Sequence, residues 1–162
     1  MNQLTFISFE TSQQGVKASL SVQGIMNIEG DVEPVMYQAV QFYEKALGEI
    51  RALLHQRKQL QKSRKRIPAR LIWRIGDVIF KLNDNLSEIG LQIDNTYYHL
   101  TRDLAVKRKW IEKVVVLRRY VQDVELIPES ANWGTFEKGR ERRPNYYCKV
   151  NKSGSLGRLV IE

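Results

Sequence analysis

The chain has 162 residues, 43% hydrophobic and 27% charged, which is typical of a folded globular protein and excludes a disordered one. The length favours one main domain and excludes two of ordinary size. The formal net charge of +8 favours a polyanionic partner, with nucleic acid the leading class. A single cysteine, Cys148, excludes an internal disulfide and a cysteine-rich metal site.

The first thirty residues have the pattern of a β-hairpin. Apolar and polar residues alternate in two runs on either side of the sequence SQQG, residues 12–15. We expect a hairpin appendage over residues 1–30, with unpaired strand edges suited to dimerisation or docking. The face expected to carry the apolar side chains consists of Leu4, Phe6 and Ser8 in the first run, then Val16, Ala18, Leu20 and Val22.

Two long amphipathic helices are expected next. Apolar residues recur at spacings of three and four over residues 35–62, and again over residues 71–82. Pro68 separates the two helices and suits the first turn of the second. Gly76 weakens that helix, so the close approach of a neighbouring helix is the expected reason for it. A short helical turn should follow and end near Gly90.

Residues 96–120, TYYHLTRDLAVKRKWIEKVVVLRRY, have the spacing of a helix-turn-helix unit. Asp94 or Asn95 can cap the first helix, and Thr101 supplies a small residue where the two helices touch. Ala105 stands at the corner in place of the usual glycine, where a positive φ would strain the backbone. The aliphatic residues expected to bury the angle between the helices are Leu100, Leu104, Val106, Ile111 and Val114.

The second helix of this unit should begin at about Lys107 and present a cationic face. Phosphates accept any Lys or Arg, whereas base edges favour Arg at guanine and Asn or Gln at adenine. Only Arg108 is placed to read a base, and Trp110 could stack, wedge or pack beneath the corner. We therefore expect backbone-directed binding of modest sequence specificity, through Lys107, Arg108, Lys109, Trp110 and Lys113.

A second basic feature precedes this unit. Residues 57–74 contain eight Lys and Arg residues and no Asp or Glu. Such segregation is typical of a phosphate-contacting surface, because each neutralised phosphate releases counterions. A solvated connection, or a patch that faces an acidic protein, would have the same composition. The residues expected to bind nucleic acid are Arg57, Lys62, Arg64, Lys65, Arg66 and Arg70, with Lys58 and Arg74 completing the basic run.

We interpret residues 126–162 as an irregular basic segment, because Pro, Gly and polar residues are frequent there. The end of this segment could form a small hairpin. A third basic group, with tyrosines nearby, could clamp a nucleic-acid backbone or stack on unpaired bases. This group consists of Lys138, Arg140, Arg142, Arg143, Tyr146 and Tyr147.

No pattern in the sequence indicates catalysis. His55 and His99 lack a neighbouring carboxylate or thiol that would define a metal site or a nucleophile. The sequence SGSLG, residues 153–157, lacks the lysine and the following helix of a phosphate-binding loop. We therefore expect no enzyme activity, no cofactor and no metal. The N-terminal residues lack an export signal and no apolar run could cross a bilayer, so we expect a cytoplasmic protein without membrane contact.

Three short motifs lie within residues 71–121. They consist of Trp73, Ile75 and Gly76, then Leu100, Asp103 and Leu104, then Arg118 and Tyr120. Over these residues the chain resembles the helical N-terminal module of the YhcG family, whose members are proposed nucleases. The resemblance implies a winged-helix-like or helical module that binds DNA or a partner protein. The catalytic domain of that family is not expected here, because only the irregular segment follows.

Together these patterns predict a mainly α-helical fold, α+β overall, with a helix-turn-helix domain over residues 31–125. The expected function is the binding of nucleic acid, with double-stranded DNA the leading candidate. The protein would act as a transcriptional regulator or as the DNA-binding subunit of a larger complex, and it could form a homodimer or a larger assembly. The alternative is a non-catalytic adaptor that binds an acidic protein.

Overall fold

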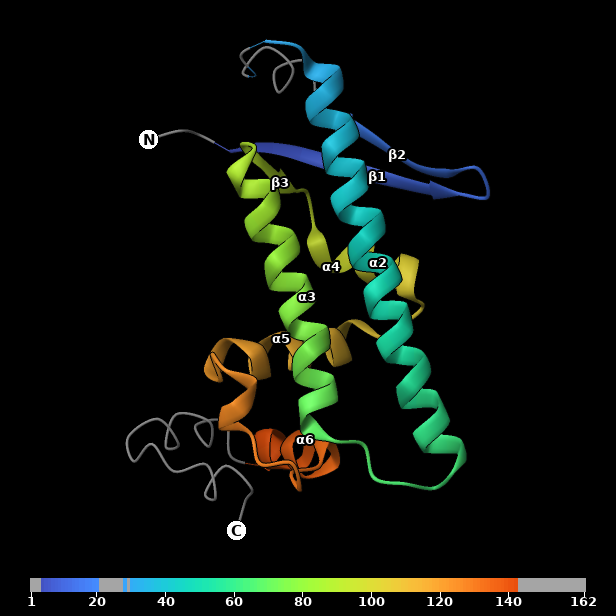
Figure 1. The fold of residues 1–162 in the computed structure, drawn as a ribbon, viewed down its shortest axis with the longest axis vertical. Helices are drawn as coiled ribbons and strands as arrows, with labels where there is room; N and C mark the ends of the chain where they lie inside the picture. The colour runs from blue at the N-terminus through green and yellow to red at the C-terminus, as the bar shows by residue number, and fades with distance from the viewer. Residues whose placement is uncertain (1–3, 21–27, 29, 143–162) are drawn as a thin grey trace. The chain divides into compact units, whose positions relative to one another are not determined.

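The computed structural model of the chain describes residues 4–20, 28 and 30–142. It is mainly helical with one small sheet, which confirms the expected mainly α, α+β class (Figure 1). Within these described ranges, no helix is long and apolar enough to cross a membrane. In chain order the elements are β1 (Thr5–Ser12), β2 (Gly15–Leu20), α2 (Val32–Lys62), α3 (Ala69–Glu88), β3 (Leu91–Ile93), α4 (Thr96–Leu104), α5 (Arg108–Tyr120), the 3-10 helix η1 (Val124–Leu126) and α6 (Trp133–Arg142).

The chain divides into two compact units. Unit 1 contains Met1–Glu49 and Val78–Arg108, and unit 2 contains Ile50–Asp77 and Lys109–Glu162. The helices α2 and α3 each contribute residues to both units, because a boundary falls inside each of them. The sheet and α4 belong to unit 1, whereas α6 and all of α5 except its first residue belong to unit 2.

The sheet of unit 1 has the strand order β2-β1-β3. The strands β1 and β2 pair antiparallel as far as Ser12 and Gly15, which confirms the expected hairpin and its turn. β3 pairs in parallel with the start of β1, where Leu91 lies opposite Thr5. The expectation of an unpaired edge is therefore wrong for residues 5–7 of β1, which pair with β3. The sequence did not indicate β3, because three residues are too few to show a period of two.

The buried face of β1 is the opposite of the expected one. Ile7 and Phe9 are fully buried, whereas Phe6 is 57% exposed. Large apolar residues occupy both phases of the sequence LTFISF, so its alternation indicates a strand without deciding which face is buried. A shift of one residue exchanges the two faces. The expected face of β2 is confirmed in its described part, where the half-buried residues are Val16, Ala18 and Leu20.

A ring stack and an ion pair organise the core of unit 1. Phe9 of β1 stacks on Tyr43 of α2, with ring centroids 4.2 Å apart and ring planes 1° from parallel. The Tyr43 hydroxyl donates a hydrogen bond to the carboxylate of Asp103. Arg102 donates from Nε to Asp103 Oδ1 at 2.8 Å, and from Nη2 to the Phe9 carbonyl at 2.8 Å. These contacts join the sheet, the first half of α2 and α4 (Figure 1).

The ionisation of this cluster follows from its burial and its partners. Burial, and then the neighbouring Asp103, raise the pKa of the Tyr43 hydroxyl, which therefore remains a donor. Burial by itself would raise the pKa of Asp103, but hydrogen bonds from Arg102, Tyr43 and Thr11 hold it below its ordinary value. The folded state therefore favours the Asp103 carboxylate, and this stabilisation is lost as the pH falls through its folded pKa.

His99 is a buried polar residue of α4. It is 4% exposed and meets the ring of Phe9 edge-on, with ring centroids 6.3 Å apart. Its Nδ1 has no hydrogen-bond partner within the part of the chain that the structure describes. Burial, and then the charge of Arg102, lower the pKa of His99 below its ordinary value of 6.5. The fold therefore favours the neutral imidazole.

We expect the stability of the protein to fall as the pH is lowered below about 6.5, because the unfolded chain protonates at His99 before the folded chain does. His99→Gln removes this titration. The variant should show a flatter dependence of the free energy of unfolding on pH between about pH 7 and about pH 5, measured by urea denaturation. His55→Gln, at an exposed position, is the control for the loss of an imidazole. An unchanged slope in His99→Gln would contradict this account.

In unit 2, α3 and α5 make a close contact at Gly76. A Cβ atom on this residue would lie 2.7 Å from Cβ of Arg118 and 3.0 Å from the Val114 carbonyl oxygen. Beside it, the Trp73 indole Nε1 donates to the Val121 carbonyl at 2.5 Å. The guanidinium of Arg118 lies over the Trp73 ring, 5.0 Å from its centroid. The expected reason for Gly76, the close approach of a neighbouring helix, is confirmed.

Gly76→Ala should destabilise the protein by about 1–2 kcal/mol, because overpacking of about 1–3 kcal/mol exceeds the gain of at most about 1 kcal/mol in helix propensity. The matched control is Gly48→Ala on α2, where nothing lies within 4 Å of the added methyl group. That change should stabilise the protein by about 0.5–1 kcal/mol. Urea denaturation measures both values, and a gain in stability for Gly76→Ala would show that the close contact is not required.

The interpretation of residues 126–162 as irregular is wrong for α6. The Trp133 N–H donates to the Ile67 carbonyl at 2.7 Å, and Asn132 Oδ1 accepts from the Thr135 N–H at 2.9 Å, which satisfies a first-turn donor of the helix. A ten-residue helix with few apolar positions has little periodicity, so tertiary contacts decide its conformation. Residues 143–162 lie outside the described residues, as do the expected C-terminal hairpin and Arg143, Tyr146 and Tyr147.

Candidate nucleic-acid interface

The charges of the chain are divided unequally between the two units. The ranges of unit 1 contain 6 Lys and Arg residues against 10 Asp and Glu, a net charge of −4. The ranges of unit 2 contain 20 Lys and Arg residues against 8 Asp and Glu, a net charge of +12. Residues 50–76, which belong to unit 2, contain nine of these cations and no acid. The excess of positive charge therefore belongs entirely to unit 2.

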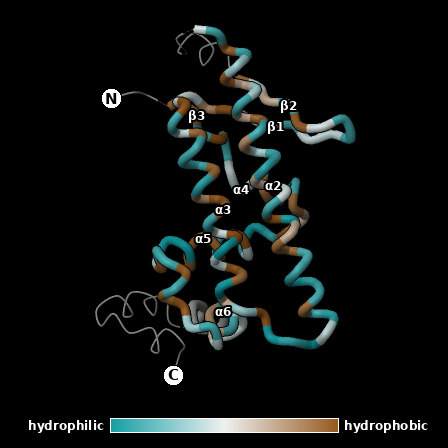
Figure 2. The backbone as a smooth tube through the Cα atoms, viewed as in Figure 1, coloured by the Kyte–Doolittle hydropathy of each residue, from teal (hydrophilic) through white to brown (hydrophobic). Residues whose placement is uncertain are grey.

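The part of α2 in unit 2 is amphipathic, with all of its basic residues except Arg57 on the exposed side. Residues at spacings of four, three and four lie on one stripe of a helix, so the exposed side chains follow a line along it. Figure 2 shows this half of α2 and the turn after it as largely hydrophilic. The partly or fully buried positions are Ile50, Leu53, Leu54, Arg57 and Leu60, and the exposed stripe is Arg51, His55, Lys58 and Lys62.

The turn that ends α2 has the two hydrogen bonds of a Schellman motif. The Lys65 N–H donates to the Leu60 carbonyl at 2.9 Å, and the Arg64 N–H donates to the Gln61 carbonyl at 3.1 Å. Arg64 has a φ of 54°, the left-handed conformation in which glycine is usual. A side chain in this conformation costs about 1 kcal/mol. Arg64, Lys65 and Arg66 are all exposed, so the turn presents three consecutive cations.

We call Lys58, Lys62, Arg64, Lys65 and Arg66 the basic stretch. All five residues are exposed, and their side chains form no ion pair or hydrogen bond with a described residue. Their charges are therefore solvated, and a polyanion could bind them without breaking a contact of the fold. The structure thus brings five cations together on the second half of α2 and the turn after it.

Two of the residues expected to bind nucleic acid are instead engaged within unit 2. Arg70 Nε donates to the Ile127 carbonyl at 2.6 Å, and the Arg70 side chain is 19% exposed. The guanidinium of Arg57 lies 4.6 Å from the centroid of the Trp110 ring. Burial lowers the pKa of Arg57, and the charge of Glu137 partly opposes this shift. Both arginines hold the fold together, so we leave them out of the candidate interface.

The helix α5 is also more buried than the sequence suggested. Trp110 is 8% exposed, so its ring packs within unit 2 rather than being available to stack on bases. The Lys113 side chain is 14% exposed and pairs with Glu137 at 3.4 Å, so the expectation that it points outward is wrong. The inward face is confirmed, since Ile111, Val114, Val115 and Leu117 are buried.

The two helices of the expected helix-turn-helix form where the sequence places them. The side chain of Asn95 caps α4, accepting from the N–H three residues further on. Ala105 ends α4 with a φ of 54°, which confirms the expected strain at the corner. Lys107, Arg108 and Lys109 are exposed, as expected, and the boundary between the units falls after Arg108. The use of this motif to read DNA stays a prediction.

The second half of α2 carries a set of candidate base-contacting residues that the helix-turn-helix spacing does not indicate. Glutamine suits adenine because its side-chain amide offers a donor and an acceptor together. The second helix of the helix-turn-helix has neither Asn nor Gln, so its spacing indicates no adenine contact. On α2 glutamines alternate with the cations of residues 56–62, and this interleaving was the available signal. The exposed glutamines there are Gln56, Gln59 and Gln61.

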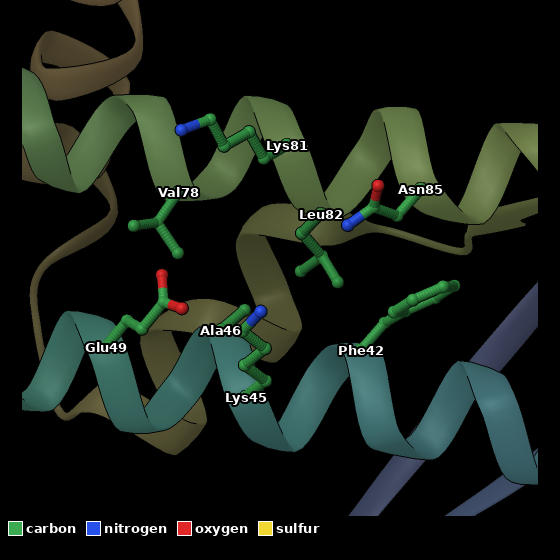
Figure 3. A pocket seen from close by; sticks show the side chains of 8 residues that line it. All are labelled: Phe42, Lys45, Ala46, Glu49, Val78, Lys81, Leu82 and Asn85. Atoms are coloured by element: carbon green, nitrogen blue, oxygen red, sulfur yellow. The ribbon is translucent and has the colours of Figure 1, made fainter.

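A small pocket lies in unit 1 between α2 and α3 (Figure 3). Its volume is about 140 Å³, below the roughly 300–1,000 Å³ of typical ligand sites. Both charge signs line it, with Glu49 directed toward α3 in Figure 3, so the pocket does not define a small-molecule site. Among the described residues, no group of His, Cys, Asp and Glu could hold a metal ion. The pocket is lined by Phe42, Lys45, Ala46, Glu49, Val78, Lys81, Leu82 and Asn85.

Comparisons with protein-family models, with curated proteins and with solved structures return no match. The resemblance to the YhcG family therefore stays a prediction. Of the residues on which it rests, Trp73, Gly76 and Arg118 meet at the contact between α3 and α5 in unit 2. Leu100 and Leu104 are buried in unit 1.

Arg70→Met should destabilise the protein by about 1–2 kcal/mol, because it removes a charged hydrogen bond to a partly buried carbonyl while keeping the apolar stem. Urea denaturation measures this loss. The matched control is Arg74→Met, one turn further along α3 at an exposed position, which should change the stability by less than about 0.5 kcal/mol. The Arg70 guanidinium also pairs with Glu125 at 3.8 Å and with Glu129 at 3.7 Å, both at exposed carboxylates. Equal effects of the two substitutions would show that none of these contacts, including the one with Ile127, contributes to stability.

Proposed function

We propose that the protein binds nucleic acid, with double-stranded DNA the first candidate, through the basic stretch of unit 2. The observation that carries this proposal is the separation of charge. Five exposed cations follow one another along residues 58–66, and no acid lies between residues 50 and 76 to neutralise them. A surface of this kind attracts polyanions and raises their rate of encounter.

A nucleic-acid backbone fits this surface better than an acidic protein does. Duplex DNA carries one negative charge for about every 1.7 Å of its axis, so it meets a line of cations with a continuous line of charge. The cations of the basic stretch run along a helix and into the turn that ends it. Carboxylates on an acidic protein would match such a line only where they follow one another at a similar spacing.

The contacts proposed here are directed mainly to phosphates. Lys and Arg side chains accept any phosphate, so the basic stretch gives affinity with little discrimination between sequences. Base contacts would come from Gln56, Gln59 or Arg108, which are exposed and have the donors to reach base edges. We propose that the protein acts as a regulator or as the DNA-binding subunit of a larger complex, with the exposed corner of the helix-turn-helix as a second contact.

Replacing Lys58, Lys62 and Lys65 together with Gln should weaken binding to a duplex of about 20 base pairs and flatten its salt dependence. Each lost phosphate contact should reduce the slope of log affinity against log salt by about 0.9, so three should reduce it by roughly 2–3. Fluorescence anisotropy from about 50 mM to about 300 mM salt measures both quantities. A parallel variant, Lys107, Arg108 and Lys109 to Gln, tests the corner of the helix-turn-helix.

The matched control replaces three lysines of unit 1, Lys17, Lys45 and Lys81, with Gln. It removes the same charge and should leave the slope nearly unchanged. An equal loss in both variants would mean that net charge alone drives the association. If the unaltered protein prefers an acidic peptide to the duplex at about 150 mM salt, the protein is an adaptor and the proposal is wrong.

A further inference from the structure

The turn after α2 has residues that its conformation does not favour. In a Schellman motif, glycine or asparagine suits the left-handed position, and the next residue is commonly apolar because it packs against the last turn of the helix. In this chain Arg64 occupies the left-handed position, with a φ of 54°, and Lys65 follows it. Cations therefore occupy two positions at which the motif usually has glycine and an apolar residue.

The attraction between cations and the C-terminus of a helix does not explain why Arg64 and Lys65 occupy these positions. The C-terminus of a helix favours positive charge, but the effect falls off within the last turn. Lys62 already supplies a cation in the last turn of α2. Arg64 and Lys65 lie beyond the helix, and Arg64 keeps its strained backbone even though glycine would relieve it.

The turn is held at both of its ends. At the helix end, the Lys65 N–H donates to the Leu60 carbonyl. At the other end, the Ile67 carbonyl accepts from the Trp133 N–H at 2.7 Å, and the Ala69 N–H donates to the Ala131 carbonyl at 2.9 Å. Residues 64–66 are therefore fixed in backbone while their side chains are exposed. A surface that is ordered before binding loses less conformational entropy on binding.

We propose that residues 64–66 form a preorganised phosphate-binding turn, in which Arg64 grips a phosphate of the nucleic-acid backbone. This inference rests on the proposed function, and it names Arg64 as the residue that makes the strongest single contact with the nucleic acid. The planar guanidinium offers two parallel N–H donors to a phosphate, which lysine cannot do. The Arg64 side chain is exposed, and the neighbouring Lys65 and Arg66 provide positive charge for the adjoining phosphates.

Arg64→Gly tests this inference, because it should change stability and binding in opposite directions. Relief of the left-handed strain should raise the melting temperature by about 1–4 °C. Loss of the phosphate contact should weaken binding to a duplex by roughly fivefold to tenfold at about 0.1 M salt, and reduce the salt slope by about 0.9. Arg64→Lys keeps the strain and the charge but not the two parallel donors, so its affinity should lie between those of Arg64→Gly and the unaltered protein.

Two controls separate the effects. Ala105→Gly relieves strain at the same φ of 54°, and calibrates the gain in melting temperature that strain relief alone produces. Lys17→Gln removes one positive charge from an exposed position of unit 1, and should leave the salt slope nearly unchanged.

If the unaltered protein binds the duplex and Arg64→Gly binds it equally well, this inference is overturned and the proposed function stands. If the unaltered protein binds neither duplex nor single-stranded nucleic acid, the proposed function itself is wrong. A loss confined to binding of an acidic peptide would overturn the phosphate assignment.

Discussion

Unit 2 depends on the close approach of α5 to α3 at Gly76. Since no side chain separates the two helices there, Arg118 lies over the ring of Trp73 and donates to Asp77 Oδ1 at 3.0 Å. The Trp73 indole in turn reaches the Val121 carbonyl just after α5 ends. One missing methyl group thus lets a hydrogen bond, an ion pair and a ring contact form together, and a larger residue at this position would separate them all.

The same packing sorts the cations of unit 2 into two groups. Burying a charge without a partner costs roughly several kcal/mol. Each cation that packs inward therefore contacts an acid, a carbonyl or an aromatic ring. Arg70 finds the Ile127 carbonyl, Lys113 finds Glu137, and Arg57 finds the ring of Trp110. The basic stretch lies on the exposed part of α2 and in the turn after it, where water solvates its charges. The proposed interface consists of cations that the fold does not use.

Local patterns in the sequence predicted the parts of the fold that local physics controls. The helix boundary at Pro68, the close approach at Gly76 and the strained corner at Ala105 are confirmed, because backbone geometry restricts proline, glycine and a helix end in any context. Four features escaped prediction. β3 is too short to show a period, and α6 has few apolar positions. The face of β1 was ambiguous because both of its phases are apolar. The helix α3 continues to Glu88, where a separate short helical turn was expected.

The sequence by itself determined the class of fold, the positions of α2, α4 and α5, and the segregation of positive charge along residues 57–74, because each of these depends mainly on neighbouring residues. Tertiary structure alone decided which cations face water. Lys58 and Arg57 are adjacent in the chain, yet Lys58 is exposed whereas Arg57 packs on Trp110, a residue 53 positions away in the sequence. A side chain finds such a partner only when the helices pack, and so the composition of the basic run could indicate a polyanion without showing which residues would contact it.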